Sequence, residues 1–371
     1  MLKKKIKILQ TIRQGKIGGG ESHVLELVEE LNKEYYESIV LSFTYGPMVD
    51  RLKSMGIKTY VIETERPFDF RKWRKVTEIL KSERIDIVHA HGTRANSNTY
   101  SSAKKLGIPV VYTVHGWSFH PDQGFLLKGL RILGEKFLVD KSELTICVSD
   151  NNLIDASKEF PMKRAEVVKY GINLKKFNPA LSFPDIRAEF GIDKDTVVIG
   201  YVVRMTKQKD PLTLVHAIAL IPSHLNVKFL FIGDGELKES AIKLAKELNV
   251  SSKIQFVDFR QDVPSILNGI DVYCLPSLWE GLPIGMLEAM AMGRAVVVTA
   301  IDGAKEVIKN MENGILVPVQ DPEKLAEALI LLIDNPELRK KIGENAAATI
   351  LSDFNVSKMT RKVESIYDKM I

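Results

Sequence analysis

Short apolar runs alternate along the chain with stretches in which apolar residues recur every three or four positions. The runs are four to eight residues long, as expected for buried strands, and the periodic stretches are long enough for helices. The predicted strands are residues 5–11, 38–42, 58–62, 85–89, 110–115, 144–149, 166–170, 196–203, 228–232, 254–257, 271–275, 295–299 and 314–317. This alternation predicts an α/β fold with doubly wound parallel sheets.

The strands form two series, and 371 residues are enough for about two domains. Residues 1–175 are predicted to form an N-terminal domain and residues 190–345 a C-terminal one. The segment 173–192 contains Pro179, Pro184 and Gly191 with little regular pattern, which is typical of a linker. Residues 346–371 are predicted to be a helix that returns toward the first domain.

Residues 277–293 have the strongest pattern of candidate chemistry. A strand at 272–275 precedes a tight loop, Pro283 suits the first position of a helix, and Gly293 suits the position just past its end. The loop therefore lies at the carboxyl end of a parallel strand, where a helix N-terminus attracts phosphate. Glu280 and Glu288 add two carboxylates, which accept hydrogen bonds from sugar hydroxyls.

Charge is unevenly distributed along the chain. Residues 1–180 hold 30 Lys and Arg against 21 Asp and Glu, whereas residues 181–371 hold 22 against 26. The basic first half favours an anionic membrane surface or a phosphorylated acceptor as partner, with a solvated basic face as the alternative.

Composition otherwise predicts a cytoplasmic globular protein. No apolar run approaches the ~20 residues of a membrane span, and the basic start lacks the apolar core of a secretory signal. Cys147 and Cys274 lie in apolar strands, as expected for buried thiols in a reducing compartment.

The predicted helix at 125–138 has two possible roles. Leu126, Leu130, Leu133 and Phe137 recur at helical spacing. A core-facing helix is the favoured interpretation, and a membrane-touching amphipathic helix is the alternative.

Several motifs, in their order along the chain, resemble the retaining glycosyltransferases of family 4. The motifs are Gly18–Gly20, Thr113–Gly116, 171–179, 203–211, Gly233–Gly235 and 276–293, with Glu280 and Glu288 eight residues apart. The resemblance spans nearly the whole chain and is most specific in the C-terminal half. Tyr170 and the pair Lys207–Gln208 depart from the family pattern.

The resemblance implies a GT-B fold, in which two Rossmann-like domains face each other across a cleft. It also implies a nucleotide-sugar donor, with a UDP-sugar favoured, held mainly by the C-terminal domain. The acceptor, a glycan or a polyprenyl-linked sugar, would bind mainly the N-terminal domain. Transfer would retain the anomeric configuration without a metal or other cofactor. No Asp-x-Asp motif is present, and His89 and His91 alone would make a poor metal site.

The resemblance also implies roles for individual residues. Arg204 and Lys209 match the cations that stabilise the departing diphosphate. Glu288 matches the carboxylate that binds the ribose. Glu280 and His115 match residues beside the transferred sugar, where Glu280 would position the donor. The remaining candidates for donor contact are Gly18, Gly19, Gly20, Arg260, Leu282, Pro283 and Ile284.

The leading hypothesis is therefore a glycosyltransferase of bacterial polysaccharide or lipid-linked glycan synthesis, cytoplasmic or on the inner face of the membrane. It binds no nucleic acid, and its oligomeric state stays open. A nucleotide-sugar 2-epimerase of the same fold and a non-catalytic nucleotide-sugar binder are the alternatives.

Overall fold

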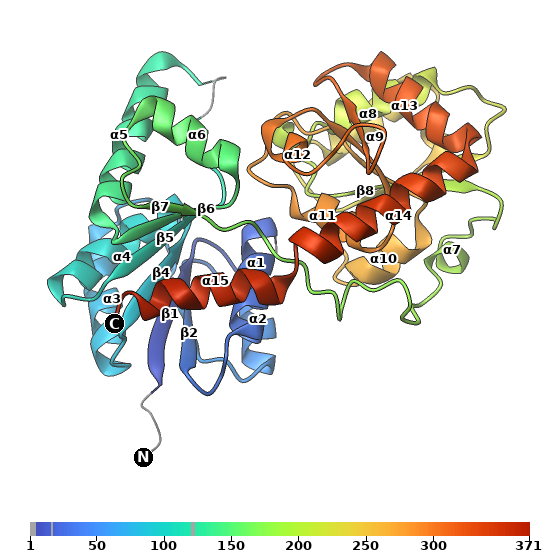
Figure 1. The fold of residues 1–371 in the computed structure, drawn as a ribbon. Coiled ribbons are helices and arrows are strands. Elements are labelled where there is room, and N and C mark those ends of the chain that lie inside the picture. Colours follow the sequence, from blue (N-terminus) through green and yellow to red (C-terminus); the bar gives the residue numbers. More distant parts are fainter. Residues whose placement is uncertain (1–4, 16–17, 120–122) are drawn as a thin grey trace. The chain divides into compact units, whose positions relative to one another are not determined.

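The computed structural model describes residues 5–15, 18–119 and 123–371 and divides the chain into two compact units (Figure 1). Unit 1 comprises residues 1–171 and 356–371, and unit 2 comprises residues 172–355. Each unit is built around one parallel sheet covered by helices on both faces.

The sheet of unit 1 has seven strands in the order β3-β2-β1-β4-β5-β6-β7. The strands are β1 (Ile6–Ile12), β2 (Tyr36–Ser42), β3 (Thr59–Val61), β4 (Ile87–His91), β5 (Val110–Val114), β6 (Leu144–Cys147) and β7 (Ala165–Val167). The helices are α1 (Gly19–Glu30), α2 (Pro47–Ser54), α3 (Phe70–Ser82), α4 (Thr93–Lys105), α5 (Phe125–Lys141), α6 (Asp150–Glu159) and α15 (Val356–Asp368).

The alternating directions of the β1 side chains show how helices cover both faces of this sheet. Ile8 packs with Leu27 of α1 and Ile366 of α15 on one face, and Leu9 packs with Val76 and Leu80 of α3 on the other. Successive residues of a strand point to opposite faces, so one apolar run serves both layers. The helix α15 follows unit 2 in sequence yet completes the core of unit 1.

The sheet of unit 2 has six strands in the order β10-β9-β8-β11-β12-β13. The strands are β8 (Val197–Val202), β9 (Val227–Ile232), β10 (Ile254–Val257), β11 (Val272–Leu275), β12 (Ala295–Thr299) and β13 (Ile315–Val317). The helices are α7 (Ile186–Glu189), α8 (Pro211–Leu220), α9 (Lys238–Glu247), α10 (Val263–Gly269), α11 (Ile284–Ala291), α12 (Asp302–Lys305), α13 (Pro322–Asp334) and α14 (Pro336–Asp353), with 3-10 turns at Lys207–Lys209 and Ser251–Lys253.

The α/β prediction is confirmed, and the predicted limits of the domains differ from the observed units. The predicted linker belongs to unit 2, where Phe177 and Ile186 are each 1% exposed. The predicted helix 346–371 is divided between two helices. Its first residues belong to α14 of unit 2, and α15 belongs to unit 1, as expected for a helix that returns to the first domain.

The helix α5 is oriented opposite to the favoured prediction. Its side toward unit 1 carries Glu135, which is fully buried and accepts hydrogen bonds from the Tyr112 hydroxyl (2.9 Å) and the Thr93 hydroxyl (2.6 Å). The predicted core residues are exposed instead, with Leu126 85% and Leu130 68% accessible. The core-facing interpretation was therefore wrong, because a buried carboxylate and its donors fix the helix the other way round.

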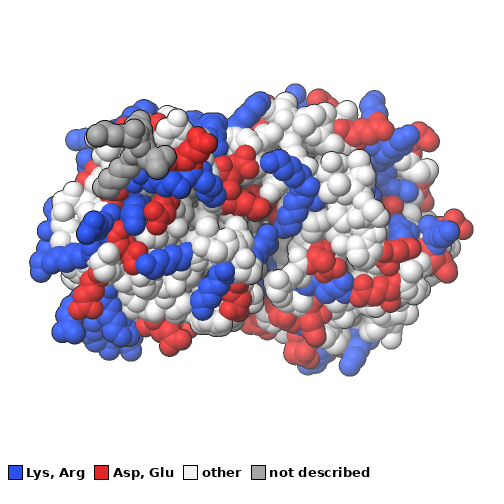
Figure 2. All heavy atoms as spheres, turned by 90° about the horizontal axis from the view of Figure 1, so that it is seen from below, with Lys and Arg blue, Asp and Glu red and all other residues white. Residues whose placement is uncertain are grey.

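The basic character of the first half is visible at the surface. Lys and Arg side chains gather on unit 1, at the left of Figure 2. Those of α3 include Arg71, Arg74 and Lys75, which are exposed.

Replacement of Arg187 tests how firmly residues 172–192 are attached to unit 2. Its guanidinium donates to the carbonyl oxygens of Gly269 (2.9 Å) and Thr196 (2.9 Å) and pairs with Asp271. Arg187→Ala leaves these acceptors unpaired and should lower the free energy of unfolding by about 2–3 kcal/mol, measured by urea denaturation. Lys324→Ala, which breaks only an exposed pair with Glu327, should cost about 0.5 kcal/mol or less. Equal effects of the two variants would contradict this account.

Candidate active site

The sheet of unit 2 has a topological switch point between β8 and β11. From β8 the chain proceeds to β9 and β10 on one side, and β11 to β13 extend on the other. The loops after β8 and β11 therefore leave the carboxyl edge side by side, which is where open α/β sheets bind ligands. The first loop carries Arg204 and Lys209, and the second carries Glu280.

Lys209 and Glu280 form the centre of this edge. The Lys209 ammonium pairs with the Glu280 carboxylate, whose side chain is 9% exposed. Ser277 Oγ donates to the same carboxylate at 2.9 Å and Gln208 Nε2 at 3.2 Å. An ionised carboxylate has about four lone-pair sites, so three donors leave roughly one for a ligand. The Lys209 ammonium uses one of its three N–H groups in this pair, so two are left to donate to a ligand.

Gln208 ties the two loops together and explains one departure from the family pattern. Its side chain also donates to the carbonyl oxygen of Trp279 (2.8 Å), and the N–H of Leu278 donates to its backbone oxygen (2.8 Å). Gln208 therefore orients Glu280 and fixes the loop that carries it. The sequence offered no interpretation of this residue.

Arg204 lies in the same loop but points to solvent. It is exposed, and within the described part of the chain its guanidinium has no ion pair. Gly233 and Gly235, in the next loop, have φ of 133° and 158°, and a Cβ there would lie 2.1 Å from the Val203 oxygen and 2.3 Å from the Met205 oxygen. Both glycines are required for this close approach of backbones.

The helix α11 begins one residue later than predicted. Pro283 caps it and has no N–H, so Ile284 and Gly285 provide the first amides directed out of its N-terminus, and Leu282 precedes the cap. A Cβ at Gly303 would lie 2.0 Å from the Gly281 oxygen, which shows how tightly the loop is packed. The predicted end is confirmed, since Gly293 follows the helix with φ of 67°.

Glu288 lies in the middle of α11, beyond its first turn. The residue is half-buried, and burial raises the pKa of its carboxyl to about 7, an effect that Lys176 partly opposes. At neutral pH this carboxyl therefore carries a proton part of the time. A ligand hydroxyl that donates to the ionised form would favour its deprotonation.

Arg260 does not join this group. Its guanidinium pairs with Glu189 of α7 and with Asp262 (Nε–Oδ1, 2.8 Å), and these bonds raise its pKa. It connects the loop after β10 to the segment 172–192. The structure gives it an internal role, and donor contact stays a prediction from the family resemblance.

In unit 1 the switch point lies between β1 and β4, next to the predicted glycine loop. Gly18 caps α1, and Gly19 and Gly20 are its first residues. A Cβ at Gly20 would lie 3.2 Å from Cδ2 of His115, so the glycine leaves room for the imidazole. The structure thus brings the predicted glycines and His115 together.

Both ring nitrogens of His115 are bonded within unit 1. Nδ1 lies 2.6 Å from the Tyr170 hydroxyl, and Nε2 lies 3.2 Å from Nδ1 of His91. His89 and His91 lie inside β4, whereas the prediction put His91 beyond the strand. Sequence patterns gave no sign that Tyr367, at the far end of the chain, bonds to His89 (2.6 Å).

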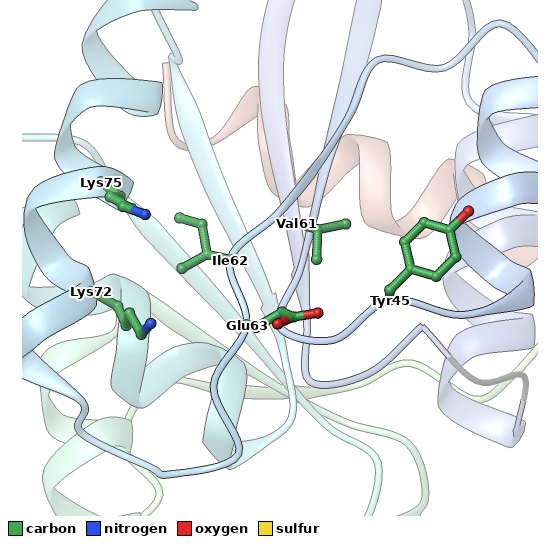
Figure 3. Close-up of a pocket in the computed structure, with 6 residues that line it drawn as sticks. All are labelled: Tyr45, Val61, Ile62, Glu63, Lys72 and Lys75. Carbon is green, nitrogen blue, oxygen red and sulfur yellow. The ribbon is translucent and has the colours of Figure 1, made fainter.

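A separate hollow of about 500 Å³ lies over the outer edge of unit 1 (Figure 3). Lys72 and Lys75 line one side and Tyr45 the other, with Val61, Ile62 and Glu63 between them. It contains none of the predicted site residues.

Residues 5–15, 18–119 and 123–371 contain neither a cluster of metal ligands nor a helix that could span a membrane. No group of three or more His, Cys, Asp or Glu there is arranged to hold a metal ion. None of the helices in these ranges has the length and apolar character needed to span a bilayer.

Comparison with known proteins places the chain in a family. Residues 17–176 match the model of Glycosyltransferase Family 4, and residues 182–349 match that of Glycosyl transferases group 1. The chain belongs to the group 1, family 4 glycosyltransferases and is a transferase enzyme.

Two similar curated proteins act on lipid-linked sugars. The UDP-Gal:alpha-D-GlcNAc-diphosphoundecaprenol alpha-1,3-galactosyltransferase of Escherichia coli is 28% identical over 99% of this chain and 98% of its own length. The N,N'-diacetylbacillosaminyl-diphospho-undecaprenol alpha-1,3-N-acetylgalactosaminyltransferase of Campylobacter jejuni is 27% identical over 91% of this chain and 93% of its own.

Solved structures confirm the two-domain, Rossmann-like GT-B fold. Anabaena HepE, solved with UDP and glucose, has a TM-score of 0.87 at 20% identity and covers 98% of this chain and 100% of its own. Sucrose-phosphate synthase of Thermosynechococcus elongatus has a TM-score of 0.85 at 19% identity, with 99% of both chains covered.

The raised pKa of Glu288 predicts a pH dependence of stability. The unfolded chain loses this proton near 4.5 and the folded chain near 7. Between these values the folded state binds more protons, so stability should fall as pH rises, by at most about 3 kcal/mol. Glu288→Gln should remove this part of the fall, measured by urea denaturation at pH 5 and pH 8. Glu337→Gln, at an exposed glutamate early in α14, should behave like the wild type, and no difference between the two variants would contradict the prediction.

Proposed function

We propose that the protein transfers a sugar from a UDP-sugar to a polyprenyl-diphosphate-linked acceptor, with retention of configuration and without a metal. The observation that carries the proposal is the Lys209–Glu280 pair at the switch point of unit 2, beside the N-terminus of α11. The names of the two relatives, both acting on diphosphoundecaprenol-linked sugars, support the acceptor class, and that of the E. coli enzyme supports the UDP donor.

The available cations support metal independence. The leaving UDP gains negative charge as the glycosidic bond breaks, and protein cations at that position lower the barrier. Lys209 has two N–H groups left after its pair with Glu280, Arg204 is exposed with its donors directed outward, and the α11 N-terminus adds oriented amides. Together they offer hydrogen-bond donors to a diphosphate: Lys209 and the α11 amides are held in place, and the exposed Arg204 side chain is able to adjust.

The bonding of Glu280 favours positioning over covalent attack. Three donors hold its carboxylate, with hydrogen bonds to both oxygens, and this bonding lowers the nucleophilicity of the oxygens. A sugar hydroxyl that donates to the remaining lone pair costs none of these bonds. We therefore assign Glu280 to hold the sugar and to stabilise the positive charge that develops at its anomeric carbon. This role fits front-face transfer, and the α linkages in the relatives' names fit retention.

The family resemblance assigns roles to further residues of each unit. Glu288 accepts from the ribose hydroxyls, and Ile284 and Gly285 donate to the phosphates. His115 hydrogen-bonds the sugar or the departing phosphate, for which one of its present bonds must open.

Lys209→Ala tests the donor site directly. The variant should lower kcat at least about 100-fold, because the charge on the leaving diphosphate loses its fixed cation. The measurement is UDP release from UDP-galactose, UDP-glucose and UDP-N-acetylglucosamine with an undecaprenyl-diphosphate-linked sugar as acceptor. Lys207→Ala, at an exposed neighbouring lysine, should stay within about twofold of the wild type.

The same assay separates the alternatives. Addition of EDTA should leave the rate of sugar transfer unchanged. Loss of activity in EDTA would contradict metal independence. The product should keep the donor's anomeric configuration by NMR. Conversion of the donor to its 2-epimer in the absence of acceptor would instead indicate an epimerase.

We further propose that α5 rests on an anionic membrane, where such an acceptor resides. The exposed side chains of Leu126 (85%), Leu130 (68%) and Leu133 (64%) recur along one face of the helix, and Phe125 (89%) is exposed at its start. A core helix buries its apolar side, whereas α5 buries a carboxylate and presents its apolar side to solvent. Such an exposed apolar side is typical of helices that lie on a membrane surface.

Positive charge near this face gives the proposal its specific partner. Phe137 of α5 contacts Phe68 (ring centroids 6.2 Å), which lies two residues before the basic helix α3, and Lys141 lies 5.6 Å over the Phe137 ring. Arg74 and Lys75 of α3 are exposed. Apolar insertion and attraction to anionic headgroups then act together.

Leu126→Ser/Leu130→Ser/Leu133→Ser should abolish flotation with vesicles of phosphatidylglycerol and phosphatidylcholine. Each leucine moved out of water contributes about 1.5–3 kcal/mol, so loss of three removes the apolar part of binding. The matched control is Leu220→Ser/Leu331→Ser/Leu351→Ser, at exposed leucines of unit 2, which should float like the wild type. Flotation that is insensitive to the α5 change, or absent in the wild type at low salt, would contradict the proposal.

A further inference from the structure

Four histidines gather in unit 1, and only one of them reaches the surface. His23 of α1 lies 5.6 Å from His91 and 5.3 Å from His115, measured between ring centroids. His115 is half-buried, whereas the other three are at most 5% exposed. Burial lowers the pKa of all four, to about 4 for His23. They are therefore neutral at pH 7, and each ring carries one N–H.

Three of these histidines belong to one unbroken chain of hydrogen bonds. At one end of the chain, Tyr170 bonds His115 Nδ1 (2.6 Å), and His115 Nε2 bonds His91 Nδ1 (3.2 Å). His91 Nε2 lies 2.9 Å from Gln10 Oε1.

The chain continues through the C-terminal helix. Gln10 Nε2 donates to the Tyr367 hydroxyl (3.1 Å), which lies 2.6 Å from His89 Nδ1, and His89 Nε2 lies 2.7 Å from Thr113 Oγ1. Apart from His115, every member is at most 3% exposed. The seven residues come from β1, β4, β5, α15 and the segments after β5 and β7.

Gln10 sets the direction of every bond in this chain. Its oxygen only accepts, so His91 must carry its proton on Nε2, and its Nδ1 is an acceptor. His115 must then carry its proton on Nε2, which leaves Nδ1 to accept from Tyr170. On the other side the Gln10 amide donates to Tyr367, so Tyr367 donates to His89 Nδ1, and His89 carries its proton on Nε2. Reversal of one member requires reversal of its neighbours.

We propose that Tyr367 and Gln10 are positioning residues that hold His115 in the Nε2–H tautomer, with Nδ1 as the nitrogen that accepts from Tyr170. Neither residue touches the ligand; they act through His91. The catalytic meaning rests on the proposed role of His115 toward the donor, whereas the tautomer itself is a property of the folded protein alone.

The arrangement has a chemical consequence at the surface end. His115 binds a proton only at Nδ1, with rotation of the Tyr170 hydroxyl, because Nε2 is occupied toward His91. An acceptor group of a ligand, such as a phosphate oxygen, is met by the Nε2–H when its bond to His91 opens. Donor and acceptor functions are thus assigned to different edges of one ring before any ligand binds.

Tyr367→Phe tests the proposal with two independent readouts. In the wild type, ¹⁵N NMR of the histidine rings should give Nε2–H signatures for His89, His91 and His115. The variant leaves Gln10 Nε2 and His89 Nδ1 without partners, so the amide is free to turn, and mixed tautomers should appear at His91 and His115. The kcat should fall about tenfold, with the donor KM changed less than about twofold.

Tyr36→Phe is the matched control. Tyr36 packs against Tyr367 (ring centroids 5.9 Å) and bonds Asp368 of the same helix (2.6 Å), but it lies outside the chain. It should leave tautomers and kcat unchanged. If both variants lower kcat alike, or if Tyr367→Phe leaves the tautomers unchanged, the proposal is overturned.

Gln10→Glu keeps Tyr367 in place and tests the direction of the chain. A carboxylate accepts on both sides, so Tyr367 must donate to it and accept from His89. His89 should then switch to the Nδ1–H form, whereas His91 and His115 keep Nε2–H, and any other pattern overturns the proposal. Because these signals require no turnover, absence of sugar transfer would count against the proposed function and leave the tautomer result standing.

Discussion

The parallel sheet imposes the constraint on which both candidate sites depend. All strands of a parallel sheet end at one edge, and a strand order that reverses leaves two neighbouring loops with no crossover between them. In unit 2 these loops carry Lys209 and Glu280, and in unit 1 they adjoin the α1 N-terminus and His91. Packing of helices on both faces then holds these loops in place. The chemistry thus occupies positions that the topology leaves open.

Much of the fold could be predicted because its strands are continuous apolar runs. The strands 254–257 and 295–299 were placed correctly to the residue, since each is a short apolar run bounded by polar or turn residues. The loops that carry Glu280 and Lys209 followed from the same pattern. Their salt bridge, and the role of Gln208 in connecting them, depend on side-chain contacts between residues 71 positions apart, which no local pattern encodes.

The failures have a common physical cause, which is polar residues in the core. The helix α4 was not predicted, because it is rich in Asn, Ser and Thr, and its Asn96, Ser97 and Thr99 are buried with hydrogen bonds instead of apolar contacts. The predicted orientation of the helix α5 was wrong because Glu135, on the side opposite the apolar stripe, is buried. Periodicity identifies a helix by its apolar face, so a face anchored by a carboxylate gives a misleading signal. The histidine chain is invisible for the same reason.

The order of segments along the chain affects how the protein is made. Unit 1 includes residues 1–171 and 356–371, and α15 supplies Ile366 and Tyr367 to its interior. During synthesis the ribosome must therefore complete the whole of unit 2 before the core of unit 1 can close. Until then, α1 covers only part of its face of the sheet. The missing contact comes from residues hundreds of positions later in the chain, so closing this core is a slow step of high contact order. Unit 2, continuous in sequence, has no such delay and is able to fold first.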